Sequence, residues 1–108
     1  MIYLASPYSY KADKELMHTR YLQALAKAAE LTKEGLAVFS PIVSSHQLSL
    51  FHDMPTTWDF WSNIDYKFLD ASSELFILML ESWDKSVGVA AEIKYAEQIG
   101  IPVTFIYP

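Results

Sequence analysis

The chain has 108 residues, of which 52% are hydrophobic and 19% are charged, so disorder is excluded and a single domain, residues 1–108, can bury a real core. Eight Lys and Arg against thirteen Asp and Glu give a net charge of −5, which argues against a nucleic-acid partner, because binding to phosphates needs a basic surface. The absence of cysteine excludes disulfides, thiolate catalysis and cysteine-built metal centres.

No apolar stretch reaches the ~18 residues that a membrane-spanning helix needs. Pro7 interrupts the N-terminal apolar run too early for a signal peptide. We therefore expect a soluble, cytoplasmic protein whose partner is a small molecule, with neither nucleic acid nor membrane as a partner.

The chain begins with a short apolar run at residues 2–5, which predicts a buried strand. Residues 11–34 then predict a long helix that stops at Gly35. Polar residues, Arg20 among them, recur on one side of this helix. The opposite, apolar side carries Leu22, Leu25, Ala26 and Ala29.

A second apolar run at residues 36–39 predicts a second strand. The segment after it, residues 42–57, has no clear period, and we predict a long loop with about one helical turn. Residues 58–71 fit a helix, and residues 75–80 give the strongest strand signal in the chain.

A loop at residues 81–85 leads to a third helix, which starts near Ser86 and stops at Gly100, and residues 101–106 form the last strand. Apolar strands that alternate with helices predict an α/β fold. We expect a small doubly wound, flavodoxin-like or Rossmann-like three-layer sandwich around a parallel sheet of about four strands.

Ligands of doubly wound sheets bind outside the carboxyl ends of the strands, where the strand order reverses. Three segments should therefore face one crevice, residues 6–10, 40–53 and 81–88. The sequence contains no phosphate-loop ATPase, dinucleotide-binding, esterase or zinc-protease motif.

Glu92 is the strongest candidate for a functional residue. At ~100° per residue it shares the core-facing side of the third helix with Gly88, Val89 and Ala96. A carboxylate there is costly unless it is hydrogen-bonded, paired or functional. The small neighbours let a ligand approach, which favours a nucleophile or general base over a glutamate that only complements the helix dipole.

Five further residues are weighed against structural alternatives. Ser86 can cap its helix or hold an anion with the free N–H groups. Asp65 has aromatic and apolar neighbours, and its carboxylate is either buried or solvated. Tyr3 is most simply a core residue. For His46 the alternatives are a contact with a ligand and a position on a surface loop. We expect His18 to pack against its neighbours or to face the solvent.

Two other groups favour structural roles. Trp58 and Trp61 form a core or interface stripe more often than a platform on which a base stacks. His46, His52 and Asp53 lack tight ligand spacing, so we expect no metal.

Three short motifs resemble those of the nucleoside 2-deoxyribosyltransferase superfamily, in the same order and spacing along almost the whole chain. They are the opening Ile-Tyr-Leu-Ala-Ser-Pro-Tyr, the Asn-Ile-Asp segment at residues 63–65, and Ser-Val-Gly-Val-Ala-Ala-Glu at residues 86–92. The resemblance implies that Glu92 is a nucleophile held ionised by Tyr3, and that Asp65 protonates the departing base.

Ser86 points to a subgroup. Transferases of free nucleosides usually carry an aspartate six residues before the glutamate. The Ser-x-Gly-x-x-x-Glu pattern resembles instead the 2'-deoxynucleoside 5'-monophosphate N-hydrolases, in which this serine binds phosphate. The resemblance thus implies that Ser86 and Gly88 hold the 5' end of the substrate, with Ser6, Ser9 and His46 as helpers.

The implied function is an N-glycosidase that cleaves a (deoxy)nucleoside 5'-monophosphate or a nucleoside, with water or a second base as acceptor. It needs no cofactor and no metal. The resemblance also implies a homodimer or higher homo-oligomer, with the aromatic helix at residues 58–71 as its interface. A non-catalytic nucleotide-binding or sensing domain on the same fold is the alternative.

Two features depart from the superfamily pattern. The first loop, residues 6–10, lacks the glycines and arginine of the hydrolase phosphate loop, and Ser73-Glu74 replaces the aspartate that usually opens the third strand. The Ser-Pro-Ile-Val-Ser-Ser-His segment at residues 40–46 places the chain nearest to a short branch of unknown function.

Overall fold

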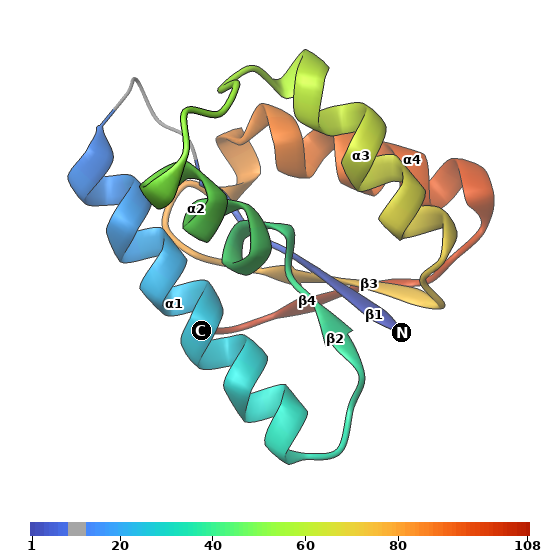
Figure 1. Ribbon diagram of the computed structural model, residues 1–108. Helices are drawn as coiled ribbons and strands as arrows, with labels where there is room; N and C mark the ends of the chain where they lie inside the picture. The colour runs from blue at the N-terminus through green and yellow to red at the C-terminus, as the bar shows by residue number, and fades with distance from the viewer. Residues whose placement is uncertain (9–12) are drawn as a thin grey trace.

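The computed structural model describes residues 1–8 and 13–108, which form a layered arrangement of helices around a central sheet (Figure 1). In chain order the elements are β1 (Ile2–Ala5), α1 (Lys14–Lys33), β2 (Val38–Phe39), α2 (Pro41–Phe51), α3 (Trp58–Asp70), β3 (Glu74–Leu78), the 3-10 helix η1 (Trp83–Lys85), α4 (Val87–Ile99) and β4 (Val103–Ile106). The predicted α/β class is confirmed.

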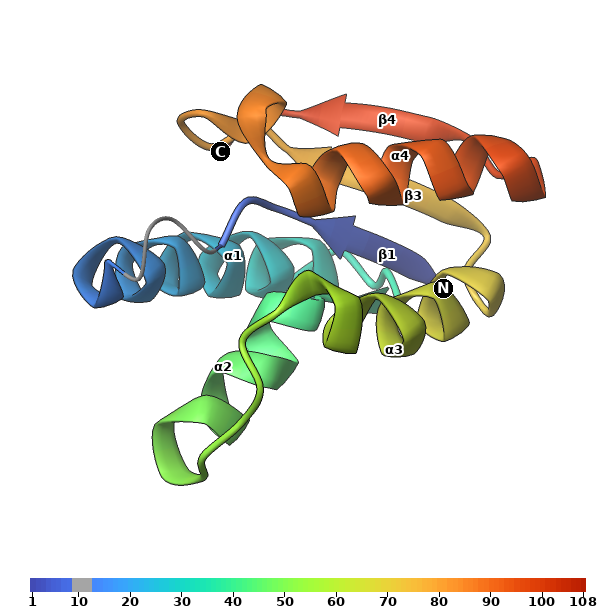
Figure 2. The same ribbon diagram turned by 90° about the horizontal axis from the view of Figure 1, so that it is seen from above.

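The four strands form one parallel sheet in the order β2-β1-β3-β4. Tyr3 on β1 pairs with Phe39 on β2 and with Leu75 on β3, and Leu75 pairs with Val103 on β4. Helix α1 covers one face of the sheet, and α3 and α4 cover the other (Figures 1 and 2). This confirms the doubly wound three-layer fold, with the reversal of strand order between β1 and β3.

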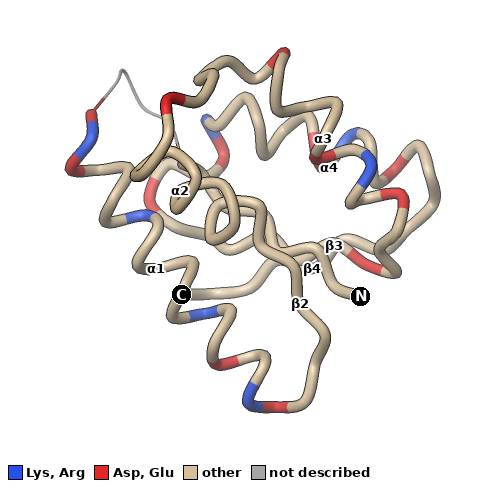
Figure 3. The backbone as a smooth tube through the Cα atoms, viewed as in Figure 1, with Lys and Arg blue, Asp and Glu red and all other residues tan. Residues whose placement is uncertain are grey.

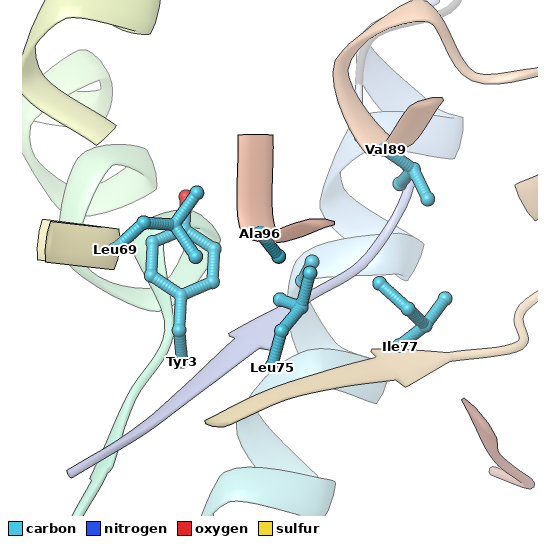
Figure 4. Packing of buried hydrophobic residues seen from close by; sticks show 7 residues of the cluster. Tyr3, Leu69, Leu75, Ile77, Val89 and Ala96 are labelled. Atoms are coloured by element: carbon cyan, nitrogen blue, oxygen red, sulfur yellow. The ribbon is translucent and has the colours of Figure 1, made fainter. Parts of the chain in front are cut away.

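The two faces of the sheet carry separate cores, because successive side chains of a strand point to opposite sides. The core under α3 and α4, shown in Figure 4, contains Tyr3, Ala5, Leu69, Leu75, Ile77, Val89 and Ala96. The core against α1 contains Leu4, Leu31, Leu78 and Leu80. Tyr3 brings a hydroxyl into the first core, where a polar group needs a hydrogen-bond partner.

Helix α2 corrects the sequence prediction, because residues 41–51 form a helix in the segment predicted as a long loop. Ser40 caps it by accepting a hydrogen bond from the Val43 amide, and Pro41 occupies the first turn, where its missing N–H is harmless. Only Pro41 and His46 of this helix are buried. A helix that buries so little leaves no apolar stripe in its sequence, so its period could not be recognised.

The buried face of α1 also differs from the prediction. The helix begins at Lys14, after the cap Asp13, and the predicted start at residues 11 and 12 lies outside the described residues. Leu22 and Leu25, which the polarity pattern placed on the apolar side, are exposed. The side chains that α1 buries are Arg20, Tyr21, Ala24 and Leu31.

The remaining differences concern the ends of elements. Strands β2 and β4 begin later than predicted, β3 begins and ends earlier, and η1 lies within the predicted loop at residues 81–85. The two helix stops agree with the prediction, since Gly35 and Gly100 both have a positive φ, which glycine adopts without strain. In the described ranges, 1–8 and 13–108, no helix is long and apolar enough to cross a membrane.

Candidate functional site

A pocket of about 970 Å³ lies where β1 ends, next to the reversal of strand order. Its walls come from the loop after β1, the N-terminal parts of α1 and α4, helices α2 and α3, and the loop between these two. This volume is typical of a site for a small molecule. Each of the three segments expected at the crevice contributes described residues, among them Ser6, His46 and Ser86.

A buried hydrogen bond joins Tyr3 to the pocket residue Glu92. Both side chains are buried, Tyr3 on the central strand β1 and Glu92 one turn into α4. The Tyr3 hydroxyl donates a hydrogen bond to Oε2 of Glu92. Burial and the nearby carboxyls Glu92 and Asp65 raise the pKa of Tyr3 far above its ordinary value, so the hydroxyl keeps its proton and remains a donor.

Asp65 on α3 lines the same pocket and is 8% exposed. Burial raises the pKa of Asp65 to about 6, against the opposing effect of a hydrogen bond from Tyr3. Burial likewise raises the pKa of Glu92 to about 8, opposed by the Tyr3 hydrogen bond and assisted by the charge of Asp65. The two carboxyls titrate as a pair, and between these values the pair holds one proton.

The first turn of α4 forms another wall. Ser86 caps the helix, accepting a hydrogen bond of 3.2 Å from the Val89 amide. A Cβ added to Gly88 would lie 3.7 Å from the ring of Trp58, which is ordinary contact, so the indole covers this helix start closely. The cap uses a lone pair of the Ser86 oxygen, and the O–H of Ser86 can still donate a hydrogen bond to an anion.

Ser6, at the end of β1, has a buried hydroxyl that makes no hydrogen bond within the described residues. A buried hydroxyl without a partner costs free energy, so Ser6 can stabilise a ligand that supplies one. Ser6 lines the pocket, as expected for a substrate-binding residue. Ser9, predicted as its companion, lies outside the described residues.

His46 lies on helix α2 and is 6% exposed, so the prediction of a loop position was wrong. Its Nδ1 is 2.6 Å from the Tyr8 hydroxyl, and its Nε2 is 3.3 Å from Nδ1 of His18. The ring of Tyr21 stacks on His46 with centroids 4.2 Å apart. Burial, together with His18, lowers the pKa of His46. The sequence analysis missed Tyr8 and Tyr21, although Tyr21 follows His18 at helical spacing.

Arg20 joins two of the pocket loops. Its guanidinium donates hydrogen bonds to the carbonyls of Tyr8, 3.3 Å away, and Glu81, 3.2 Å away. Tyr8 follows β1 and Glu81 follows β3, so one buried cation holds together the loops on the two sides of the strand-order reversal. Sequence polarity had placed Arg20 on the solvent side, because carbonyl partners distant in the chain leave no local signal.

The described residues contain no group of three or more His, Asp or Glu side chains that could hold a metal ion. His46, His52 and Asp53 all line the pocket but do not form such a group. Figure 3 shows Lys and Arg interleaved with acidic residues along α1.

Replacing Glu92 by Gln is expected to stabilise the fold at neutral pH. Folding raises the pKa of Glu92 from 4.5 to about 8. The free energy of unfolding of the wild type is therefore highest at low pH and falls as the pH rises between these two values. We expect the variant to gain on the order of 3 kcal/mol in free energy of unfolding at pH 7 and nothing at pH 4, measured by urea unfolding.

The control for this experiment is Glu97→Gln, since Glu97 is exposed on the same helix. It should leave the free energy of unfolding nearly unchanged at both pH values. A Glu92→Gln protein no more stable than wild type at pH 7 would contradict the burial of this carboxyl.

Comparison with known proteins gives one assignment. No curated protein matches the chain. The family described as domain of unknown function (DUF1937) matches residues 1–107, which is nearly the full chain, and the protein therefore belongs to this DUF1937 family.

Proposed function

We propose that the protein is an N-glycosidase that cleaves the bond between base and sugar in a nucleoside or a nucleoside 5'-monophosphate. The observation that carries the proposal is the pair of buried carboxyls, Glu92 and Asp65, which line one pocket and both interact with the hydroxyl of Tyr3. The resemblance of these three positions to the nucleoside 2-deoxyribosyltransferase superfamily supports the same activity.

In the proposed reaction, the bond between C1' and the base nitrogen breaks and its electron pair leaves with the base. A carboxylate oxygen of Glu92 bonds to C1', and Asp65 supplies the proton that neutralises the departing base. Water then attacks C1' of the glycosyl ester and gives a proton to Asp65. The bond between C1' and the Glu92 oxygen breaks, and Glu92 leaves as a carboxylate. A second base can take the place of water.

The number of protons on the carboxyl pair fits this chemistry, and the proton has to pass from Glu92 to Asp65 before Glu92 can attack. The reaction needs one ionised and one protonated carboxyl, and the pair holds one proton between the pKa of about 6 at Asp65 and the pKa of about 8 at Glu92. Glu92 is the deeper group and retains the proton in the empty pocket. Positive charge that develops on the sugar lowers the pKa of Glu92 and favours its ionised, attacking form.

Other walls of the pocket suit the rest of such a substrate. Ser6 offers a hydroxyl without a partner, and Ser86 and Gly88 lie at the start of α4, where backbone N–H groups attract oxygen atoms of a ligand. Trp58 and Trp61 line the same pocket and offer aromatic surface to a base.

A nucleotide sensor without turnover is the second candidate. It is favoured by a first loop without the glycines and arginine of the hydrolase branch. In this case the buried carboxyls would serve binding alone.

Release of free base separates the two candidates. Wild type should release base from at least one member of a panel of ribo- and deoxyribonucleosides and their 5'-monophosphates, measured by chromatography. Glu92→Ala should lower the rate by about 10³-fold or more, because the nucleophile is lost, and still bind the preferred member, measured as a shift in melting temperature. Glu97→Ala, on the exposed side of α4, should keep full activity. No release from any panel member, with binding intact, would favour the sensor.

The pH dependence of base release tests the carboxyl pair. We expect a bell-shaped profile of kcat/KM with its maximum between about pH 6 and about pH 8. The Tyr3 hydrogen bond lowers the pKa of both carboxyls. Tyr3→Phe should therefore move both limbs of the profile to higher pH, by ~1 unit, which equals the ~1.4 kcal/mol of a hydrogen bond to a charged group. Unmoved limbs would contradict the shared hydroxyl.

We further propose a homodimer in which a second copy covers a groove between α2 and α3. The groove is lined by apolar side chains that are more than a third exposed, namely Leu48, Phe60, Ile64 and Phe68. Exposed apolar surface of this kind is typical of an interface. Sedimentation should give a dimer for wild type and a monomer for Ile64→Asp. The control Leu22→Asp, on α1, should remain a dimer. A monomeric wild type would contradict the proposal.

A further inference from the structure

The three histidines of the chain, His18, His46 and His52, all line the pocket that contains Glu92. They come from α1, from α2 and from the end of α2, and Lys14 at the start of α1 lines the same part. Figure 1 shows that the start of α1 and helix α2 lie together at one end, whereas α3 and α4, which carry the carboxyls, lie together at the other. We call the side of the pocket formed by α1 and α2, with Lys14, His18 and His46, the histidine-lysine end, and the side formed by α3 and α4, with Asp65 and Glu92, the carboxyl end.

At the histidine-lysine end, three side chains form a continuous hydrogen-bonded chain. It runs from the hydroxyl of Tyr8 to Nδ1 of His46, 2.6 Å away, and from Nε2 of His46 to Nδ1 of His18, at 3.3 Å. His46 is fixed in the middle, since Tyr21 stacks on its ring and the side chain is 6% exposed. His18 is exposed, and its Nε2 makes no hydrogen bond within the described residues.

The contact between the two imidazoles needs one ring to donate and the other to accept. The pair can take up one extra proton and keep both hydrogen bonds of the chain, whereas a second extra proton would set two N–H donors against each other. Burial disfavours charge on His46, so the extra proton belongs on the exposed ring of His18. The hydrogen-bonded chain can thus carry one extra proton without losing either of its hydrogen bonds.

Lys14 precedes His18 by four residues on α1, which places the two side chains on one face of the helix. The other titratable or charged groups around this end are Tyr8, Asp13, Glu15, His52, Asp53 and the buried Arg20, whose guanidinium donates to the carbonyls of Tyr8 and Glu81. Two cations side by side suit a dianion. The carboxyl end, with Glu92 and Asp65, would repel a dianion.

We propose that His18 and Lys14, backed by His46 and Tyr8, form a phosphate-binding subsite at the α1–α2 end of the pocket. Identification of the rest of the ligand as a nucleoside rests on the proposed function. The subsite is distinct from the start of α4, which carries Ser86 and Gly88. The ligand is then a phosphate ester that lies along the pocket, with its phosphate between α1 and α2 and its glycosidic bond near Glu92.

The test is a histidine titration by proton NMR, with inorganic phosphate as the probe. The chain has only three imidazole rings, and the variants His18→Gln, His46→Gln and His52→Gln assign their signals. Increasing phosphate should shift the signals of His18 until the site is saturated and leave the signals of His52 unchanged. Lys14→Gln should weaken binding, whereas Lys67→Gln, on α3 outside the pocket, should not.

Several outcomes would overturn the subsite. These are an unchanged His18 signal, an equal shift of all three signals, equal binding by His18→Gln, or a shift that EDTA removes, which would indicate a metal between the two rings. Glu92→Gln separates this inference from the proposed function, because it should abolish base release and leave phosphate binding intact. Nucleoside 5'-monophosphates should displace inorganic phosphate in this variant, and the matching nucleosides should not.

Discussion

The hydroxyl of Tyr3 crosses from the middle of the sheet to a carboxyl on α4, and the rest of the pocket is arranged around that hydrogen bond. It is available because β1 is central in the order β2-β1-β3-β4, so its side chains lie under the helices of one face. Tyr3 pairs in register with Leu75, and Leu69 and Ala96 pack around its ring in the same core. A shift of one residue in β1 would turn Tyr3 to the α1 face and leave Glu92 without its donor.

The free energy needed to bury two carboxyls has to come from contacts elsewhere in the fold. Burial raises the pKa of both Glu92 and Asp65, so each is less stable in its ionised form than it would be in water. The two cores, above and below the sheet, supply the compensating apolar burial. Arg20 adds a polar link, because it donates hydrogen bonds to both the loop after β1 and the loop after β3. Carboxyls whose ionised form is destabilised by burial are typical of binding and catalytic sites.

Sequence reasoning succeeded where a local pattern carries the physics and failed where the partner is distant. Apolar runs located the strands, and alternation with helices predicted the parallel sheet, because burial on both faces leaves a continuous apolar signature. Glu92 stood out as a charge on an otherwise apolar helix stripe, and its burial is confirmed. Helix α2 was missed because it buries only Pro41 and His46. Arg20 was placed on the wrong side because its partners are backbone carbonyls of loops, which no periodicity reveals.

The different charges at the two ends of the pocket would orient a bound ligand. The carboxyl end favours groups that are neutral or become positive, such as a sugar carbon losing its base, and the histidine-lysine end favours a phosphate. If both ends are occupied by one molecule, the attraction at His18 and Lys14 also draws the phosphate away from Glu92, so binding would not suppress ionisation of the proposed nucleophile. A phosphate bound beside Glu92 would instead raise the pKa of that carboxyl and oppose its attack. A subsite at the far end of the pocket therefore reconciles an anionic ligand with a buried carboxylate nucleophile.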